Sequence, residues 1–268
     1  MKLTLLLSLI FLYSCSHGPA MNRTIPVASW DALKEESVIR WDQQRLSTLT
    51  SSNALCYQGE VKKGLDSLKK SFYERRRNSH YWIEVGNCYF LSKKFSQAEF
   101  YYQLALNETK NNKVKGMAYN NLGIIALEQK NWSIAQELFL QSIKQDGSLK
   151  VPRYNLALLY LDFNLIDQAQ KLVENYRNIS DVDFLVINAR IYLLKNDLKS
   201  AGVLFNKLPD FSLKRADISV LYAWYLTLVK DFNRAGNVLS SREPSSIKEL
   251  ERFGDQVSDS VSVQTKGK

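Results

Sequence analysis

The feature that most constrains this fold is a pair of columns of small residues that recur at intervals of about 34 residues. The first column consists of Ser52, Gly86, Gly123, Ala157, Ala189 and Ala223. The second stands twelve positions after the first and consists of Gly64, Ala98, Ala135, Ala169, Ala201 and Ala235. Two antiparallel helices approach closely only where neither carries a bulky side chain, so the columns indicate helix pairs that cross at these positions. The sequence therefore predicts an all-α chain of six similar helix-turn-helix units rather than an ordinary helical bundle.

Two further columns carry larger apolar residues at the same intervals. One consists of Val61, Phe95, Trp132, Ile166, Leu198 and Phe232. The other consists of Leu68, Tyr102, Phe139, Val173, Phe205 and Leu239. These spacings predict that the small residues mark the crossings and that the larger side chains fill the space between neighbouring helix pairs.

The stretch from Ser79 to Asn107 shows the complete pattern. Its first part reads W-x-x-V-G-x-x-Y and its second part reads A-x-x-x-Y-x-x-A, with the specified residues at Trp82, Val85, Gly86, Tyr89, Ala98, Tyr102 and Ala105. This pattern resembles the tetratricopeptide repeat (TPR), a helix-turn-helix unit of about 34 residues. The resemblance implies a right-handed TPR solenoid over residues 30–253, with repeats near 45–78, 79–115, 116–149, 150–181, 182–215 and 216–249.

The C-terminal end is expected to close the solenoid. A short helix at Ile247–Phe253 is placed to cover the last apolar face, as a solenoid requires. Residues 254–268 are polar and contain few large apolar side chains, so we expect this tail to be disordered.

The N-terminus has the pattern of an exported lipoprotein. One Lys precedes an apolar run from Leu3 to Leu12, which is too short to span a bilayer at about 20 residues. Residues 1–14 are therefore expected to be a signal peptide. The segment Leu12–Cys15 resembles a bacterial lipobox, which implies that Cys15 carries lipid; plain secretion is the alternative. Residues 15–29 would then be a tether, and the absence of Asp after Cys15 implies the outer membrane of a Gram-negative cell, facing the periplasm.

The other two cysteines, Cys56 and Cys88, fall on the first helices of neighbouring repeats. An oxidising compartment would permit a disulfide between them. Neither has a His nearby or metal-ligand spacing. We expect buried free thiols, with the disulfide as the alternative.

The residues that carry catalysis and cofactor binding are sparse. There are two His, at His17 and His80, which leaves little for a metal site or a Ser/His/Asp triad. No nucleotide-binding, metalloprotease or nucleophile-elbow motif is present. The net charge of +9 and the 14 Tyr would suit nucleic acid, but export argues against it. We expect no enzyme, no cofactor, no metal and no nucleic acid; the oligomeric state is open.

The TPR resemblance implies a binding groove on the concave face, formed by the first helices. The positions that match the family's groove are mostly apolar and should form an exposed strip, with a ladder of Asn side chains that could bond the backbone of a bound segment. The alternative is that the chain covers this face itself. The predicted groove residues are Leu49, Asn53, Ile83, Asn87, Phe90, Asn120, Ile124, Leu127, Tyr154, Leu158, Leu161 and Trp224.

The first repeat also carries a dense set of cations, which we call the basic patch. It faces only Asp66 and Glu74 as nearby opposite charges. Such a run is commonly a solvated helix face, but it also suits anionic lipid headgroups or acidic envelope polymers. The basic patch consists of Lys62, Lys63, Lys69, Lys70, Arg75, Arg76 and Arg77.

The whole plan of a lipidated N-terminus, a tether and six repeats resembles the outer-membrane pilotins of type IV pilus systems. That resemblance implies a non-enzymatic scaffold that holds a partner peptide or helix during secretin or pilus assembly. The alternative is an envelope adaptor that binds anionic polymer or peptidoglycan hydrolases through its basic N-terminal repeat.

Overall fold

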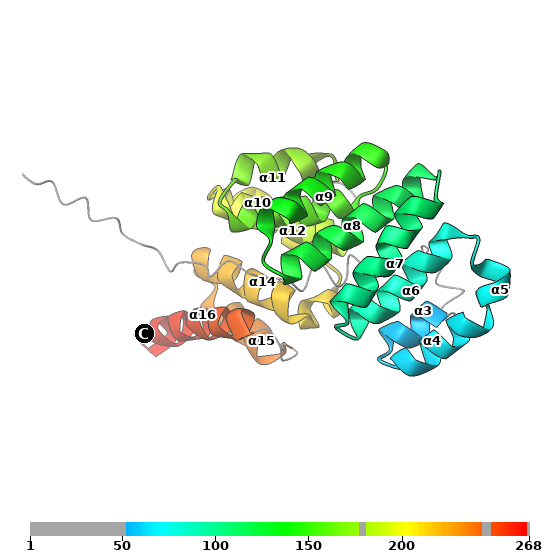
Figure 1. Cartoon of the computed structure of the whole chain (residues 1–268). Coiled ribbons are helices and arrows are strands. Elements are labelled where there is room, and N and C mark those ends of the chain that lie inside the picture. Colours follow the sequence, from blue (N-terminus) through cyan, green and yellow to red (C-terminus); the bar gives the residue numbers. More distant parts are fainter. Residues whose placement is uncertain (1–51, 177–180, 243–247, 267–268) are drawn as a thin grey trace, which may run out of the picture.

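The computed structural model describes residues 52–176, 181–242 and 248–266, which contain helices and no strand. The signal peptide, Cys15, the tether and Leu49 of the predicted groove lie outside the described residues. Six helix pairs follow one another, and the two helices of each pair pack together (Figure 1). They are α3 (Ser52–Tyr57) with α4 (Val61–Lys70), α6 (Ser79–Leu91) with α7 (Phe95–Glu108), α8 (Asn112–Glu128) with α9 (Trp132–Gln145), α10 (Val151–Asp162) with α11 (Ile166–Val173), α12 (Val182–Leu194) with α13 (Leu198–Phe205), and α14 (Ala216–Leu228) with α15 (Phe232–Ser240).

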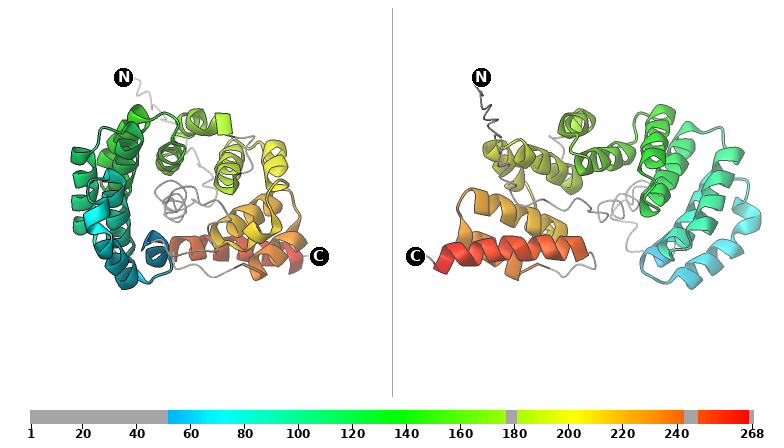
Figure 2. Two further views of the ribbon diagram at one scale, coloured as in Figure 1. Left: turned by 90° about the vertical axis from the view of Figure 1, so that its right-hand side faces the viewer. Right: turned by 60° about the vertical axis from the view of Figure 1, so that its left-hand side comes forward.

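Shorter elements connect the pairs. Helix α5 (Phe72–Arg75) follows α4, and 3₁₀ turns cover Glu174–Tyr176 and Asp210–Lys214. Each second helix also contacts the first helix of the next pair, so the pairs form a curved array that ends with α16 (Lys248–Lys266) (Figure 2). The six predicted helix-turn-helix units are confirmed.

The columns of small residues lie where the helices of a pair cross, as predicted. The Ala residues of the second column, from Ala98 to Ala235, are all 0% exposed. A β-carbon on Gly86 would lie 2.5 Å from the ring of Tyr102, and one on Gly123 would lie 2.7 Å from the ring of Phe139. The small residue of one helix therefore accommodates the large apolar residue of its partner.

The turn inside every pair has the same backbone geometry. The residue two positions after each first helix has a positive φ, at Gly59, Lys93, Lys130, Asn164, Asn196 and Lys230. In the third pair, Lys130 N–H donates to Leu127 C=O at 2.9 Å, and Asn131 N–H donates to Ala126 C=O at 2.8 Å. The other five turns make the corresponding two bonds. This is a Schellman motif, which satisfies the last carbonyl groups of the first helix and reverses the chain.

The positive φ of 61° at Lys130 leads to a stability prediction. A left-handed conformation strains a residue that has a β-carbon, whereas Gly adopts it freely. We expect Lys130→Gly to raise the free energy of unfolding by about 0.5–1 kcal/mol in thermal or urea unfolding. Glu137→Gly, at an exposed position inside α9 of the same repeat, should lower it by about 1 kcal/mol. A loss of stability in both variants would contradict the role assigned to the turn.

The third pair begins earlier than the predicted boundary at residue 116. The 79–115 unit is three residues longer than the 34-residue repeat, and its last three residues, Lys113 to Lys115, lie in the first turn of α8. The reason is a cap: the Asn111 side chain accepts from Lys113 N–H at 2.9 Å and from Val114 N–H at 3.3 Å. The insertion therefore lengthens a helix rather than a loop.

The predicted disordered tail is wrong for residues 254–266, which continue α16. Phe253, Val257 and Val261 recur at four-residue spacing, and they pack against the last pair. Val257 is 4% exposed and Val261 is 8% exposed. Arg242 also forms an ion pair with Glu251 of α16, with 2.7 Å between Arg242 Nη2 and Glu251 Oε2. A 19-residue helix, rather than the expected short one at Ile247–Phe253, covers the end of the solenoid.

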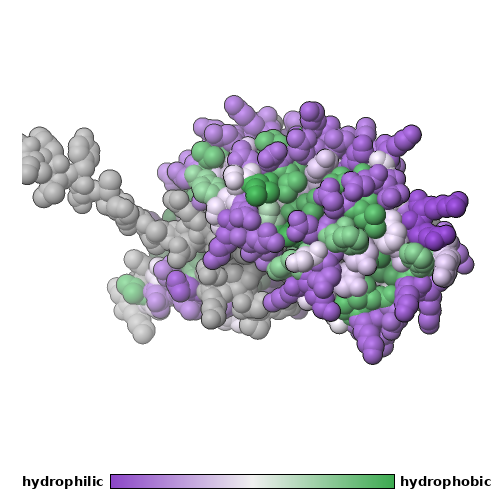
Figure 3. Space-filling view, in the orientation of Figure 1, coloured by the Kyte–Doolittle hydropathy of each residue, from purple (hydrophilic) through white to green (hydrophobic). Residues whose placement is uncertain are grey.

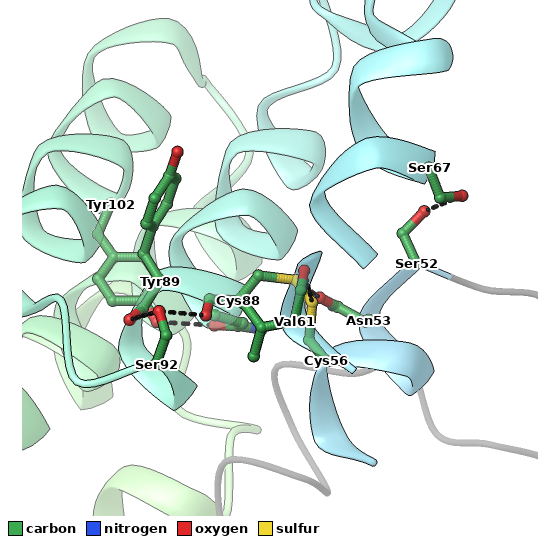
Figure 4. Close-up of a disulfide and its surroundings, with 10 residues drawn as sticks. Ser52, Asn53, Cys56, Val61, Ser67, Cys88, Tyr89, Ser92 and Tyr102 are labelled. Carbon is green, nitrogen blue, oxygen red and sulfur yellow. Dashed lines mark hydrogen bonds between the residues drawn. A yellow bond between two sulfur atoms is a disulfide. The ribbon is translucent and has the colours of Figure 1, made fainter. Parts of the chain in front are cut away.

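Cys56 and Cys88 form a disulfide, so the expectation of free thiols is wrong. The bond joins α3 to α6 across the first two repeats, and the two Cα atoms are 5.2 Å apart, within the range that a disulfide requires (Figure 4). Both residues are buried, at 1% and 0% exposure. Placing first helices side by side brings the two sulfur atoms together.

Candidate functional site

The described residues contain no group of three or more His, Cys, Asp or Glu side chains that could hold a metal ion. No helix among them is long and apolar enough to cross a membrane. His80 Nδ1 lies 3.2 Å from Glu84 Oε1, and Arg75 donates to the same oxygen. Burial alone would raise the pKa of Glu84, but the hydrogen bonds from His80 and Arg75 hold it below its usual value. This cluster links α5 to α6.

The predicted groove residues are mostly buried, so the expectation of an exposed strip is wrong for them. Ile83, Phe90, Ile124, Tyr154 and Leu161 are all less than 5% exposed. They pack into core clusters that neighbouring repeats share. Leu127, Leu158 and Trp224 remain half-buried. Contact of any of these residues with a partner stays a prediction.

The predicted Asn ladder is also buried, and its members Asn87 and Asn120 bond to Asn121 and Asn155, two amides that the prediction did not include. Asn121 Nδ2 donates to Asn87 Oδ1 at 3.0 Å, and Asn120 Nδ2 donates to Asn121 Oδ1 at 3.1 Å. Asn155 Nδ2 donates to Asn120 Oδ1 at 2.9 Å. Within the described part of the chain, Asn87 Nδ2 and Asn155 Oδ1 have no hydrogen-bond partner. The ladder therefore ties three successive first helices, α6, α8 and α10, to one another.

Tyr102 completes this network from α7. Its hydroxyl donates to Asn87 Oδ1 at 2.8 Å. Complete burial raises the pKa of Tyr102 well above its usual value, which keeps the hydroxyl protonated as a donor. Asn53, the remaining member of the predicted ladder, is 3% exposed on α3 beside the disulfide (Figure 4).

The later repeats carry a charged cluster that the sequence analysis did not identify. Arg215 bridges two repeats, with Nη1 2.8 Å from Asp183 and Nη2 2.8 Å from Asp217. Arg190 Nη2 lies 3.4 Å from Asp162. Burial, followed by the nearby Asp183 and Asp217 charges, raises the pKa of Tyr154 well above its usual value. The sequence did contain a signal for this cluster, because Asp183 and Asp217 are each the second residue of a first helix in neighbouring repeats.

An open pocket lies between repeats one and two, where α4 and α5 meet α6 and α7, and we call it the aromatic pocket. It has a volume of about 600 Å³. Figure 3 shows apolar atoms gathered over the region between α4 and α7. The pocket is lined by Leu65, Asp66, Leu68, Lys69, Phe72, Tyr81, Trp82, Val85, Tyr89, Phe100, Tyr101 and Leu104.

Stacked rings form the wall of the aromatic pocket. Tyr101 stacks on Trp82, with centroids 5.9 Å apart, and on Tyr89, with centroids 5.3 Å apart. Burial, followed by the neighbouring Tyr89, raises the pKa of Tyr101, so its hydroxyl is neutral at physiological pH. Phe100 stands at the rim and is 61% exposed. The pocket therefore combines an ordered apolar wall with a large apolar side chain in solvent.

Comparison with known proteins identifies the architecture. No protein-family model matches the sequence, and no curated protein matches it. Among solved structures, PilF of Pseudomonas aeruginosa is similar with a TM-score of 0.59 and 15% identity, covering 85% of this chain and 99% of PilF. PilW, a widely conserved type IV pilus biogenesis factor, is similar with a TM-score of 0.57 and 13% identity, covering 75% of this chain and 94% of PilW. A TPR protein from Parabacteroides merdae is similar with a TM-score of 0.56 and 14% identity, and the match covers 88% of this chain and 91% of that protein.

The chain has the tetratricopeptide-repeat fold. In this TPR solenoid the aromatic pocket is lined by the second helices α4 and α7 together with α5 and the first helix α6, whereas the predicted groove was expected on the concave face of the first helices. The sequence did contain a signal for the pocket, because Phe100 and Tyr101 are aromatic residues on α7 that lie outside the core column, which takes Tyr102. The predicted core columns include Tyr102 but neither Phe100 nor Tyr101, so the pocket was not predicted.

A second pocket lies further along the TPR solenoid, between α9 and α10. Its volume is about 720 Å³, and Trp132, Tyr160 and Phe163 contribute its rings. Trp132 and Phe163 meet edge to face, with centroids 6.2 Å apart. Apolar pockets thus recur beside second helices.

Proposed function

We propose that this protein is a non-enzymatic, lipid-anchored scaffold of the cell envelope that holds a segment of a partner protein during secretin or pilus assembly. The observation that carries the proposal is the aromatic pocket. The pocket is open and its wall consists of stacked aromatic rings, whereas most of the predicted groove residues are buried. Apolar pockets of several hundred Å³ with a few polar groups at the rim are typical binding sites.

The likeness to PilF and PilW supports the pilus part of the proposal. The match covers 99% of PilF and 94% of PilW, so the similarity extends over whole chains rather than one or two repeats.

The disulfide supports the envelope location. Buried disulfides persist in oxidising compartments such as the bacterial periplasm and are rare in the cytosol. The lipobox resemblance at Leu12–Cys15 adds the anchor. A scaffold held at the membrane would present the aromatic pocket to envelope proteins without diffusing away.

The partner segment is expected to bury a large apolar side chain against Tyr101 and Phe100. We predict that Phe100→Asp lowers partner affinity by about 30-fold or more, as loss of an interface hot spot does. Helicity by circular dichroism and the melting temperature should be unchanged, because Phe100 is 61% exposed. The measurement is co-purification of crosslinked partners from cells, with mass spectrometry to identify a secretin or pilus component.

Phe211→Asp is the matched control. Phe211 is an exposed Phe, at 74%, and it lies in the fifth repeat, away from the aromatic pocket. Capture should survive this change. Equal capture by the wild type and Phe100→Asp would contradict the pocket as the partner site. The half-buried groove residues Leu127, Leu158 and Trp224 would then be the better candidates for the partner site.

A further inference from the structure

The basic patch projects from the first repeat with few compensating charges. Lys63 pairs with Glu60 at 2.6 Å, and Arg75 pairs with Glu84. Within the described residues, the other five cations of the patch make no ion pair: Lys62, Lys69, Lys70, Arg76 and Arg77. All five are exposed. The end of the molecule that carries α5 is strongly hydrophilic in Figure 3.

Aromatic side chains are interleaved with these cations. Tyr73 is 82% exposed, the most exposed large apolar side chain of the described residues. The Arg76 guanidinium lies 5.6 Å from the ring centroids of both Phe72 and Tyr73. An exposed ring with a polar tip, held among cations, is the arrangement found at membrane–water interfaces, where the ring enters the headgroup layer and the cations meet phosphates.

We propose that the basic patch and Tyr73 dock the first repeat onto anionic phospholipid headgroups. Charge complementarity favours an anionic partner, because the cations of residues 60–77 outnumber the carboxylates. The carboxylates are Glu60, Asp66 and Glu74, and Glu60 already pairs with Lys63. Each Lys or Arg near an anionic leaflet adds to the attraction. The exposed Tyr73 side chain distinguishes this surface from a plainly solvated helix face.

Docking through this surface would orient the solenoid as well as hold it. Lys69 and Phe72 belong to both the α4–α5 surface and the wall of the aromatic pocket. The pocket would therefore open close to the bilayer, where a membrane-embedded partner emerges. The proposal does not rest on the identity of that partner, because membrane docking is measured without one.

Vesicle binding tests the proposal. The protein is the processed chain beginning at residue 15, with Cys15→Ser so that it carries no lipid. We expect co-flotation with phosphatidylcholine vesicles containing roughly one-third phosphatidylglycerol, and little with phosphatidylcholine alone. Lys70→Gln/Arg76→Gln/Arg77→Gln should weaken binding to the anionic vesicles roughly tenfold or more. Tyr73→Ala should weaken it several-fold at unchanged charge.

The matched control removes the same charge elsewhere. Lys113→Gln/Lys144→Gln/Lys199→Gln changes three exposed Lys on α8, α9 and α13, and it should keep full binding. Equal losses in both triple variants would overturn the proposal, because general net charge would then explain the binding. Binding to purified peptidoglycan sacculi that exceeds vesicle binding, and that is lost in the patch variant, would also overturn it in favour of an acidic polymer.

Discussion

Reduction of the Cys56–Cys88 disulfide should destabilise the first two repeats by about 3 kcal/mol. The bond closes a chain segment with a sequence separation of 32 residues, so its loss returns considerable conformational entropy to the unfolded chain. The short helix α3 spans only Ser52–Tyr57, and its other connections are its contacts with α4 and α6. A hydrogen bond of 3.0 Å between the Ser52 and Ser67 hydroxyls is one of them (Figure 4).

Because each repeat of a solenoid contacts mainly its neighbours, the loss should be local. Amide hydrogen exchange should accelerate in α3 and α4 of the Cys56→Ser/Cys88→Ser variant, while α12 to α15 keep their protection. A reductant should shift the wild type toward the variant and leave the variant itself unchanged. Equal protection of α3 and α4 with and without the bond would show that packing alone holds the first repeat.

The six helix pairs could be predicted from the sequence because their signal is steric and periodic. The same helix crossing occurs in all six repeats, so each repeat has a pair of small residues equivalent to Gly123 and Ala135. Together these six pairs define the period and the register of the repeat. The Schellman turns were less visible, because three of the six place a Lys at positive φ, at Lys93, Lys130 and Lys230, where Gly is the usual marker.

The groove on the concave face was predicted less well, because periodicity identifies one face of a helix but not what packs against that face. Ile124 and Asn120 match groove positions of the TPR pattern, yet they are 1% and 3% exposed. Apolar and amide side chains serve equally for a groove and for contacts between repeats. Only the packing distances decide that Asn120 bonds to Asn121 and Asn155.

The disulfide and the C-terminal helix were missed for related reasons. Spacing places Cys56 and Cys88 on adjacent first helices but does not tell whether the sulfur atoms face each other. In α16, three apolar residues among many polar ones suffice to dock a helix, since Phe253, Val257 and Val261 lie on one stripe. Mean composition conceals such a stripe.

A β-carbon at the crossing between α8 and α9 should have the second large effect on stability. At Gly123 it would lie 2.7 and 2.9 Å from two atoms of the Phe139 ring, which is 0% exposed and cannot swing away. We expect Gly123→Val to lower the free energy of unfolding by about 3 kcal/mol or more, because overpacking forces the two helices apart. Urea unfolding measures the change.

A second substitution identifies the cause. Phe139→Leu removes part of the ring that meets the new side chain, so Gly123→Val/Phe139→Leu should be more stable than the sum of the two single changes predicts, by about 1 kcal/mol or more. Gly236 in α15 provides the matched control, since its β-carbon would meet nothing closer than Val261 at 3.7 Å. Gly236→Ala should raise stability by roughly 0.5–1 kcal/mol through helix propensity. If Gly123→Val proved as harmless as Gly236→Ala, the crossing would not require a small residue, and the column of small residues would lose its physical explanation.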